Sequence, residues 1–175
     1  MKTALVTGAT SGIGRQMAVD LENSGWKVLV HGRDREKTEA VCELCQNSVS
    51  FVADLSLLSE TQELTDSIRA KFGKLDALVL NAGTITAKRT LTSEGLETMF
   101  AVNHMAPYLL TQNLSPILSA KGQILVVSTE AHRWIKKVDL DNLQAEKKFR
   151  VLNHYATTKA ANILASLEWQ HRLLD

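Results

Sequence analysis

Short apolar runs rich in β-branched residues alternate with longer amphipathic stretches along this 175-residue chain. Such short runs are typical of buried strands, and stretches with a period near 3.6 residues are typical of helices. Repeated strand–helix units predict an α/β fold, a doubly wound parallel sheet with helices on both faces. The expected strands are residues 3–7, 27–31, 49–54, 77–81 and 123–128, and the expected helices are about 12–24, 34–46, 57–72, 94–118 and 154–174.

The composition fits one globular domain over residues 1–175, with 45% apolar residues and a formal charge of +1. The balanced charge and the aromatic content of 5% argue against a nucleic-acid binder. No apolar stretch approaches the roughly 20 residues of a membrane span, and the first residues do not resemble a signal peptide, so a cytoplasmic location is expected. Cys42 and Cys45 fall late in an expected helix, where neither a redox motif nor a metal site is predicted.

The loop after the first strand, TGATSGIG at residues 7–14, predicts a dinucleotide site. Ligands of a parallel sheet bind beyond the carboxyl ends of its strands. Glycines at positions 8, 12 and 14 let the backbone approach a pyrophosphate, and the following helix offers free N–H groups and a positive dipole end. The cofactor contacts expected here are Gly8, Thr10, Ser11, Gly12, Ile13 and Gly14.

The second strand ends in HGRD, which favours NADP(H) over NAD(H). Dinucleotide sites often place an acidic residue here for the ribose hydroxyls, whereas this chain has Gly32 and then Arg33. A guanidinium pairs with a 2′-phosphate, and Arg15 in the first helix would add a second positive contact. The alternative is that Arg33 is an ordinary solvated surface residue.

The third and fourth loops supply further candidates at the same edge of the sheet. Asp54 would accept a hydrogen bond from the adenine amine and Leu55 would cover the ring, although Asp54 equally suits a cap for the helix near residue 57. The small residues of the NAG segment, Asn81, Ala82 and Gly83, would let the loop lie flat against a cofactor. Asn81 alone also suits a turn.

Tyr155 and Lys159 lie four residues apart in NHYATTK, so they share one face of the expected last helix. Together with the glycine loop, NAG, Asn103 and the hydroxyl pair at 128–129, this motif resembles the short-chain dehydrogenase/reductase family. The resemblance implies a hydride transfer between a nicotinamide and a carbonyl or alcohol carbon. Tyr155 would donate the proton, Lys159 would strengthen the phenol as an acid and hold the nicotinamide ribose, and Asn103 would anchor a relay water.

Two features depart from the usual family pattern. The position that aligns with the family's catalytic serine holds Thr129, with Ser128 as the fallback, so Thr129→Val is expected to lower turnover more than Ser128→Ala. Thr129 and Tyr155 are 26 positions apart, and the insert between them contains Trp134, Ile135, Leu140 and Leu143. It resembles the retinol-dehydrogenase and protochlorophyllide-reductase-like branch, which implies an apolar aldehyde or ketone substrate. A surface flap without substrate contact is the alternative for the insert.

The resemblance also implies strands beyond the helix at 154–174, so the fold is expected to be truncated there. Two functions remain open: an NADPH-dependent oxidoreductase, or a catalytically weak NADPH-binding or interaction module. The helix at 154–174 is apolar over more than one stripe, which indicates cover on more than one side. In the family this helix and that at 94–118 pair across a twofold interface, so a homodimer or tetramer is expected.

Overall fold

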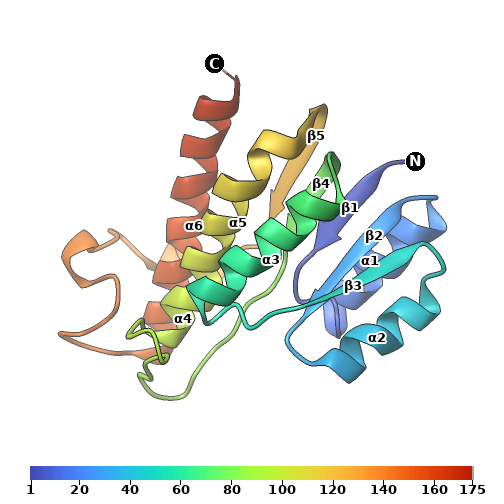
Figure 1. Cartoon of the computed structure of the whole chain (residues 1–175). Helices are drawn as coiled ribbons and strands as arrows, with labels where there is room; N and C mark the ends of the chain where they lie inside the picture. Colours follow the sequence, from blue (N-terminus) through green and yellow to red (C-terminus); the bar gives the residue numbers. More distant parts are fainter. Residues whose placement is uncertain (175) are drawn as a thin grey trace.

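A computed structural model, which describes residues 1–174, confirms the predicted α/β fold (Figure 1). Five parallel strands form one sheet in the order β3-β2-β1-β4-β5. The chain starts at β1, winds outward to β3 and then crosses to β4 on the other side of β1. This change of direction between β1 and β4 creates a switch point at the carboxyl edge of the sheet. The strands are β1 (Thr3–Val6), β2 (Lys27–Gly32), β3 (Ser48–Val52), β4 (Leu75–Leu80) and β5 (Leu118–Val126).

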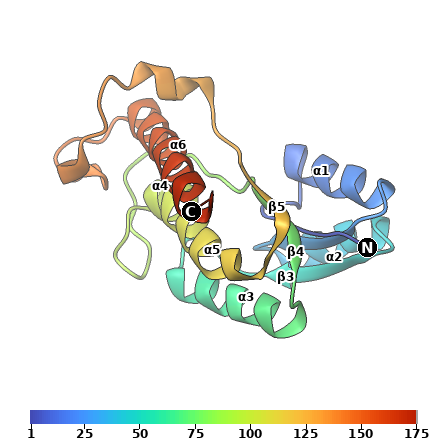
Figure 2. The ribbon, with the colours of Figure 1, turned by 90° about the horizontal axis from the view of Figure 1, so that it is seen from above.

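Helices cover both faces of the sheet, as Figure 2 shows from above. One face carries α1 (Gly12–Asn23) and α2 (Arg35–Leu44), and the other carries α3 (Leu58–Lys71) and α5 (Ala106–Leu114). The long helix α6 (Val151–Leu174) lies beside α5 near the β5 edge. The remaining elements are short: α4 (Thr98–Phe100), a π-helical turn η1 (Ala101–Met105), and the 3-10 segments Ser115–Ile117, Glu130–Trp134 and Leu140–Asn142.

The strands bury side chains on both faces, which explains their nearly continuous apolar runs. Leu5 and Leu78 point into the cluster that includes Ile68 of α3 and Leu110 of α5. The opposite face has a second cluster of strand valines against α1 and α2. Because successive strand residues point to opposite faces, neither layer could form without the other.

The expected helix at 94–118 is wrong in its start and its continuity. Its first helical residue is Thr98, because the Glu97 carboxylate accepts a hydrogen bond from Phe100 N at 2.8 Å and caps the helix there. The helix then widens into the π turn around Asn103 and ends at Leu114. A π turn inside a helix often marks a functional position.

The fifth strand also differs from its expected bounds of 123–128. It begins at Leu118, and its pairing with β4 shifts register between Leu75 and Ala77. It ends at Val126, so residues 127 and 128 leave the sheet. The other predicted elements differ from the observed bounds by three residues or fewer. Within residues 1–174, no helix combines the length and apolarity that a membrane crossing needs.

Candidate active site

A cavity of about 880 Å³ opens beyond the carboxyl ends of the strands and gathers most of the predicted site residues. Arg15, Asn103 and Thr129 do not line it. The wall also contains residues outside the predicted set, among them His31, Thr84 and Ile85. The predicted residues that line the cavity are Gly8, Thr10, Ser11, Gly12, Ile13, Gly14, Arg33, Asp54, Leu55, Asn81, Ala82, Gly83, Ser128, Tyr155 and Lys159.

The glycine loop is shaped by close backbone approaches that a side chain would block. Gly8 has φ +63°, and a Cβ there would lie 2.9 Å from the Ala82 Cα. A Cβ on Gly14 would lie 2.4 Å from the Gly8 carbonyl oxygen. Ser11, at the N-cap of α1, makes no capping hydrogen bond with its side chain, and the first turn carries no acidic residue. The first amides of α1 are therefore available to an anionic ligand such as a pyrophosphate.

Asn81 holds the glycine loop in place from β4. Its Nδ2 donates to the Thr7 carbonyl at 2.9 Å and to the Gly8 carbonyl at 3.2 Å. Its backbone N–H donates to Thr7 Oγ1 at 3.0 Å. Asn81 thus braces the two central loops of the sheet against each other, a role beyond the turn that its residue type suggested.

The two arginines proposed for a 2′-phosphate lie in different places. Arg33 lines the cavity directly after β2, is exposed, and makes no ion pair within residues 1–174. Arg15 is exposed on the first turn of α1 but is not part of the cavity wall. The geometry therefore supports Arg33, and not Arg15, as the cation that faces a ligand in this cavity.

His31, near the end of β2, links the loop after β1 to the loop after β3. Its Nε2 donates to the Ala53 carbonyl at 3.1 Å, so Nδ1 is left as the acceptor for Gly8 N at 3.4 Å. Burial lowers the pKa of His31 to about 4, although the bond to Ala53 and the charge of Asp54 oppose the shift. His31 is therefore neutral at physiological pH, with its proton on Nε2.

Asp54 is not the cap of α3, which was one of its two predicted roles. The first amides of α3 donate instead to Glu94, from Leu58 N at 2.6 Å and from Ser59 N at 3.1 Å. Asp54 Oδ1 accepts from Ser56 N at 2.9 Å, while the residue lines the cavity beside Leu55. Its position agrees with a ligand-facing carboxylate.

Tyr155 and Lys159 face the cavity from the same side of α6. Lys159 Nζ lies 6.0 Å from the centre of the Tyr155 ring and donates to the Val127 carbonyl at 2.9 Å. Lys159 is buried, and this desolvation lowers the pKa of its ammonium group. The pair therefore places a phenol near a poorly hydrated positive charge.

Ser128, and not Thr129, is the hydroxyl that reaches the cavity. Ser128 Oγ donates to the Lys159 carbonyl at 3.2 Å, and the residue lines the cavity with Tyr155. Thr129 caps the following 3-10 segment, where its Oγ1 accepts from Ala131 N at 3.3 Å. The role of the two hydroxyls in the chemistry stays a prediction.

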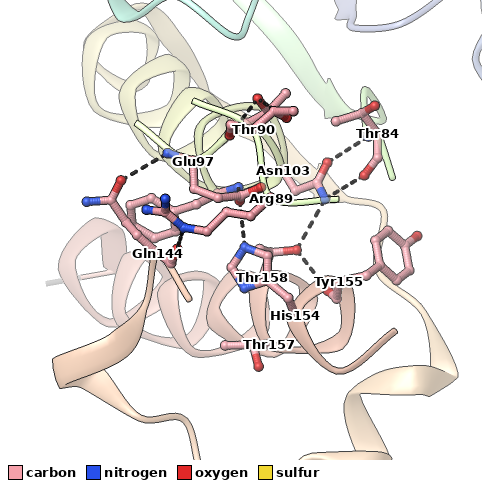
Figure 3. Close-up of polar contacts among 12 residues, drawn as sticks. Thr84, Arg89, Thr90, Glu97, Asn103, Gln144, His154, Tyr155, Thr157 and Thr158 are labelled. Carbon is pink, nitrogen blue, oxygen red and sulfur yellow. Dashed lines mark hydrogen bonds and ion pairs between the residues drawn. The ribbon is translucent and has the colours of Figure 1, made fainter. Parts of the chain in front are cut away.

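Asn103 is buried behind the cavity wall, where it ties three segments together (Figure 3). Its side chain accepts from Thr84 N at 2.7 Å and donates to the Thr84 carbonyl at 2.9 Å and to Thr158 Oγ1 at 3.2 Å. Its own carbonyl accepts from Asn162 Nδ2 at 2.6 Å. Asn103 therefore fixes the loop after β4 to α6, whereas the relay water stays a prediction.

The insert between Ser128 and Tyr155 contributes none of its four predicted apolar residues to the cavity wall. Trp134 is 63% exposed and Leu140 is 75% exposed, while Ile135 and Leu143 are half-buried. Polar contacts hold the segment instead, because Arg89 Nε donates to the Gln144 carbonyl at 3.0 Å. This arrangement favours the surface-flap alternative.

The five-stranded sheet, the cavity at its carboxyl edge and the Tyr155–Lys159 pair define a Rossmann-like domain. Residues 2–173 match the short chain dehydrogenase family. The chain is 33% identical over 98% of its length to retinol dehydrogenase 14 of Mus musculus, and 34% identical over 98% to the human WW domain-containing oxidoreductase. The crystal structure of landomycin C-6 ketoreductase LanV with bound NADP and rabelomycin is 27% identical and superposes with a TM-score of 0.79, covering 98% of this chain and 70% of that one.

The chain belongs to the short-chain dehydrogenase family. It spans 57% of the length of the mouse retinol dehydrogenase and 45% of the human WW domain-containing oxidoreductase. The matched part contains the sheet, the glycine loop and the helix with Tyr155 and Lys159.

Proposed function

We propose that this protein is an NADP(H)-dependent oxidoreductase that interconverts a carbonyl and an alcohol. The observation that carries the proposal is the single cavity wall that joins the glycine loop to Ser128, Tyr155 and Lys159. The uncapped start of α1 and the close approach at Gly14 suit a dinucleotide pyrophosphate. Asp54 and Leu55 would hold the adenine, and the NAG segment would border the nicotinamide side.

The proposed chemistry assigns one task to each side chain. When bound, the cofactor supplies a hydride to the carbonyl carbon. Tyr155 donates its phenolic proton to the carbonyl oxygen, and the Lys159 ammonium stabilises the phenolate that remains. Ser128 donates a hydrogen bond to the same oxygen and orients the substrate.

The preference for NADP(H) rests on Arg33, a cation on the cavity wall that makes no ion pair within residues 1–174. Several related structures contain bound NADP, which supports the same choice. In a fluorescence titration we expect saturable binding of NADPH, with NADH weaker by about tenfold or more, the worth of one charge-assisted contact.

Arg33→Gln is expected to remove that preference and leave NADH binding unchanged, and Arg15→Gln serves as its matched control outside the cavity. Equal affinity of the wild-type chain for both cofactors would refute the assignment to Arg33. No binding of either cofactor would refute the cofactor site itself.

The substrate class we propose is an apolar aldehyde or ketone. Ile85 and Val102 give apolar side chains to the same cavity wall as Tyr155. Relatives whose names specify a retinol dehydrogenase and a ketoreductase support this class.

Turnover measurements can distinguish the roles of the Ser128 and Thr129 hydroxyls. With a carbonyl substrate that the protein reduces, Ser128→Ala is expected to lower kcat by about 100-fold, as for the loss of one oxyanion contact. Thr129→Val should change kcat little, because its hydroxyl serves the 3-10 segment. A larger loss in Thr129→Val, in steady-state assays on folded variants, would return the role to Thr129.

A further inference from the structure

Helix α6 presents a buried polar stripe next to the face that carries Tyr155 and Lys159. The stripe consists of His154, Thr158 and Asn162, which are four residues apart and therefore lie above one another on the helix. Their exposed fractions are 4%, 1% and 4%. A buried stripe of three polar residues on a helix is costly unless each member finds a partner.

Every member of this stripe finds its partner in the segment 97–104. His154 Nε2 donates to Glu97 Oε2 at 2.6 Å, and Thr158 Oγ1 accepts from Asn103 Nδ2 at 3.2 Å. Asn162 lies 3.0 Å from His104 Nδ1 through its Oδ1 and donates to the Asn103 carbonyl through its Nδ2. We call these six residues, Glu97, Asn103, His104, His154, Thr158 and Asn162, the polar seam.

Glu97 joins the polar seam to two other segments, and Figure 3 shows its contacts with His154 and Gln144. It is fully buried, and the same carboxylate oxygen that accepts from His154 also accepts from Phe100 N at 2.8 Å. Burial acts to raise the pKa of Glu97, but the hydrogen bonds from His154 and from the backbone outweigh it, so the carboxyl pKa falls below its usual value. Glu97 N donates to Gln144 Oε1 at 3.0 Å, which extends the contact to the insert.

The seam lies next in sequence to the proposed catalytic pair. His154 precedes Tyr155, and Thr158 precedes Lys159. Rotation of a helix by one residue turns each side chain through about 100°, which would remove both groups from the cavity. Apolar packing is non-directional and resists such a rotation weakly, whereas hydrogen bonds require fixed distances and angles.

We propose that the polar seam sets the rotation and height of α6, so that Glu97 and His154 are positioning residues for Tyr155 and Lys159. The catalytic consequence of this arrangement rests on the proposed function, but its effect on the position of α6 does not. Buried polar pairs of this kind specify register more than they add stability. The seam also explains why the helix before Asn103 begins at Thr98, since Glu97 caps that helix at Phe100 N and also bonds His154 of α6.

The test compares Glu97→Leu, His154→Leu and the double variant. Each single variant leaves one buried polar partner unpaired and should unfold at lower temperature. The double variant replaces the pair by two apolar side chains and should recover only part of the melting temperature, because the cap that Glu97 provides to Phe100 N stays lost. If the pair positions α6, the double variant still places Lys159 poorly, and its affinity for NADPH falls by about tenfold, the loss of one charge-assisted contact.

A measurement made without cofactor tests this proposal independently of the proposed function. Val127 and Ser128 contact Lys159 from the loop that follows β5, so their amide NMR signals report the position of α6. We expect these signals to shift in the double variant and to stay in place in Thr157→Val, a control on α6 outside the seam. Unchanged signals together with unchanged NADPH affinity in the folded double variant would overturn the proposal. Shifted signals in a chain that binds no NADPH would uphold the seam and refute the cofactor site.

Discussion

Some residues of the site can be predicted from a sequence motif, and others can be identified only in the folded structure. Gly8 and Gly14 could be predicted from the glycine motif, because both positions exclude a side chain. A Cβ on Gly8 would meet Ala82, and a Cβ on Gly14 would meet the Gly8 carbonyl. His31 was not predicted as a site residue, because a histidine at the end of a strand carries no motif. Its place between Gly8 and Ala53 depends on strand β2 and on the loops after β1 and β3, which meet only in the sheet. The positions of Ser128 on the cavity wall and of Thr129 at the cap of the 3-10 segment likewise depend on where β5 ends, which its composition does not fix.

The buried neutral state of His31 predicts a loss of stability in acid. Its pKa is about 4 in the folded chain, against 6.5 for an unperturbed histidine. Between those values the unfolded state binds more protons than the folded state, so stability falls as the pH falls from about 6.5 to about 4. The full shift is worth about 3 kcal/mol.

His31→Gln supplies the matched comparison, because an amide offers the same donor to Ala53 and the same acceptor to Gly8 without titrating. Urea unfolding at a series of pH values should show a shallower pH dependence for His31→Gln than for the wild-type chain. Parallel curves for the two proteins would show that His31 does not titrate on unfolding in this range.

Elements were predictable where local pattern and burial agree. The strands β1 to β4 and the helices α1 to α3 could be predicted from apolar periodicity. Their apolar side chains are buried in the two layers on either side of the sheet, so the local pattern reflects their burial. The segment 94–118 was misjudged because long-range partners decide it. Glu97 caps the helix at Thr98 and accepts a hydrogen bond from His154, and Asn103 in the π turn bonds Thr84 and Thr158. The apolar periodicity of residues 94–118 does not indicate these partners.

At the scale of the whole molecule, α6 exposes apolar side chains near its C-terminal end. Leu164 and Leu167 lie three residues apart on α6 and are 55% and 60% exposed, although Tyr108 of α5 packs on Trp169 nearby. We propose that a second copy of the chain covers this surface about a twofold axis, which would bring the two α6 helices together. Apolar side chains at (i, i+3) form a continuous stripe suited to such a contact.

The double variant Leu164→Lys/Leu167→Lys tests this association. The wild-type chain should show a mass near twice 19.3 kDa by light scattering at micromolar concentration, and the variant should show a single copy. Four lysines brought together across a twofold axis would repel one another and remove the apolar area that drives association. Leu152→Lys is the control, because Leu152 is 57% exposed at the other end of α6 and should leave the mass unchanged. A wild-type chain that is monomeric at these concentrations would contradict the twofold contact, and a tetramer would place a second interface elsewhere on the molecule.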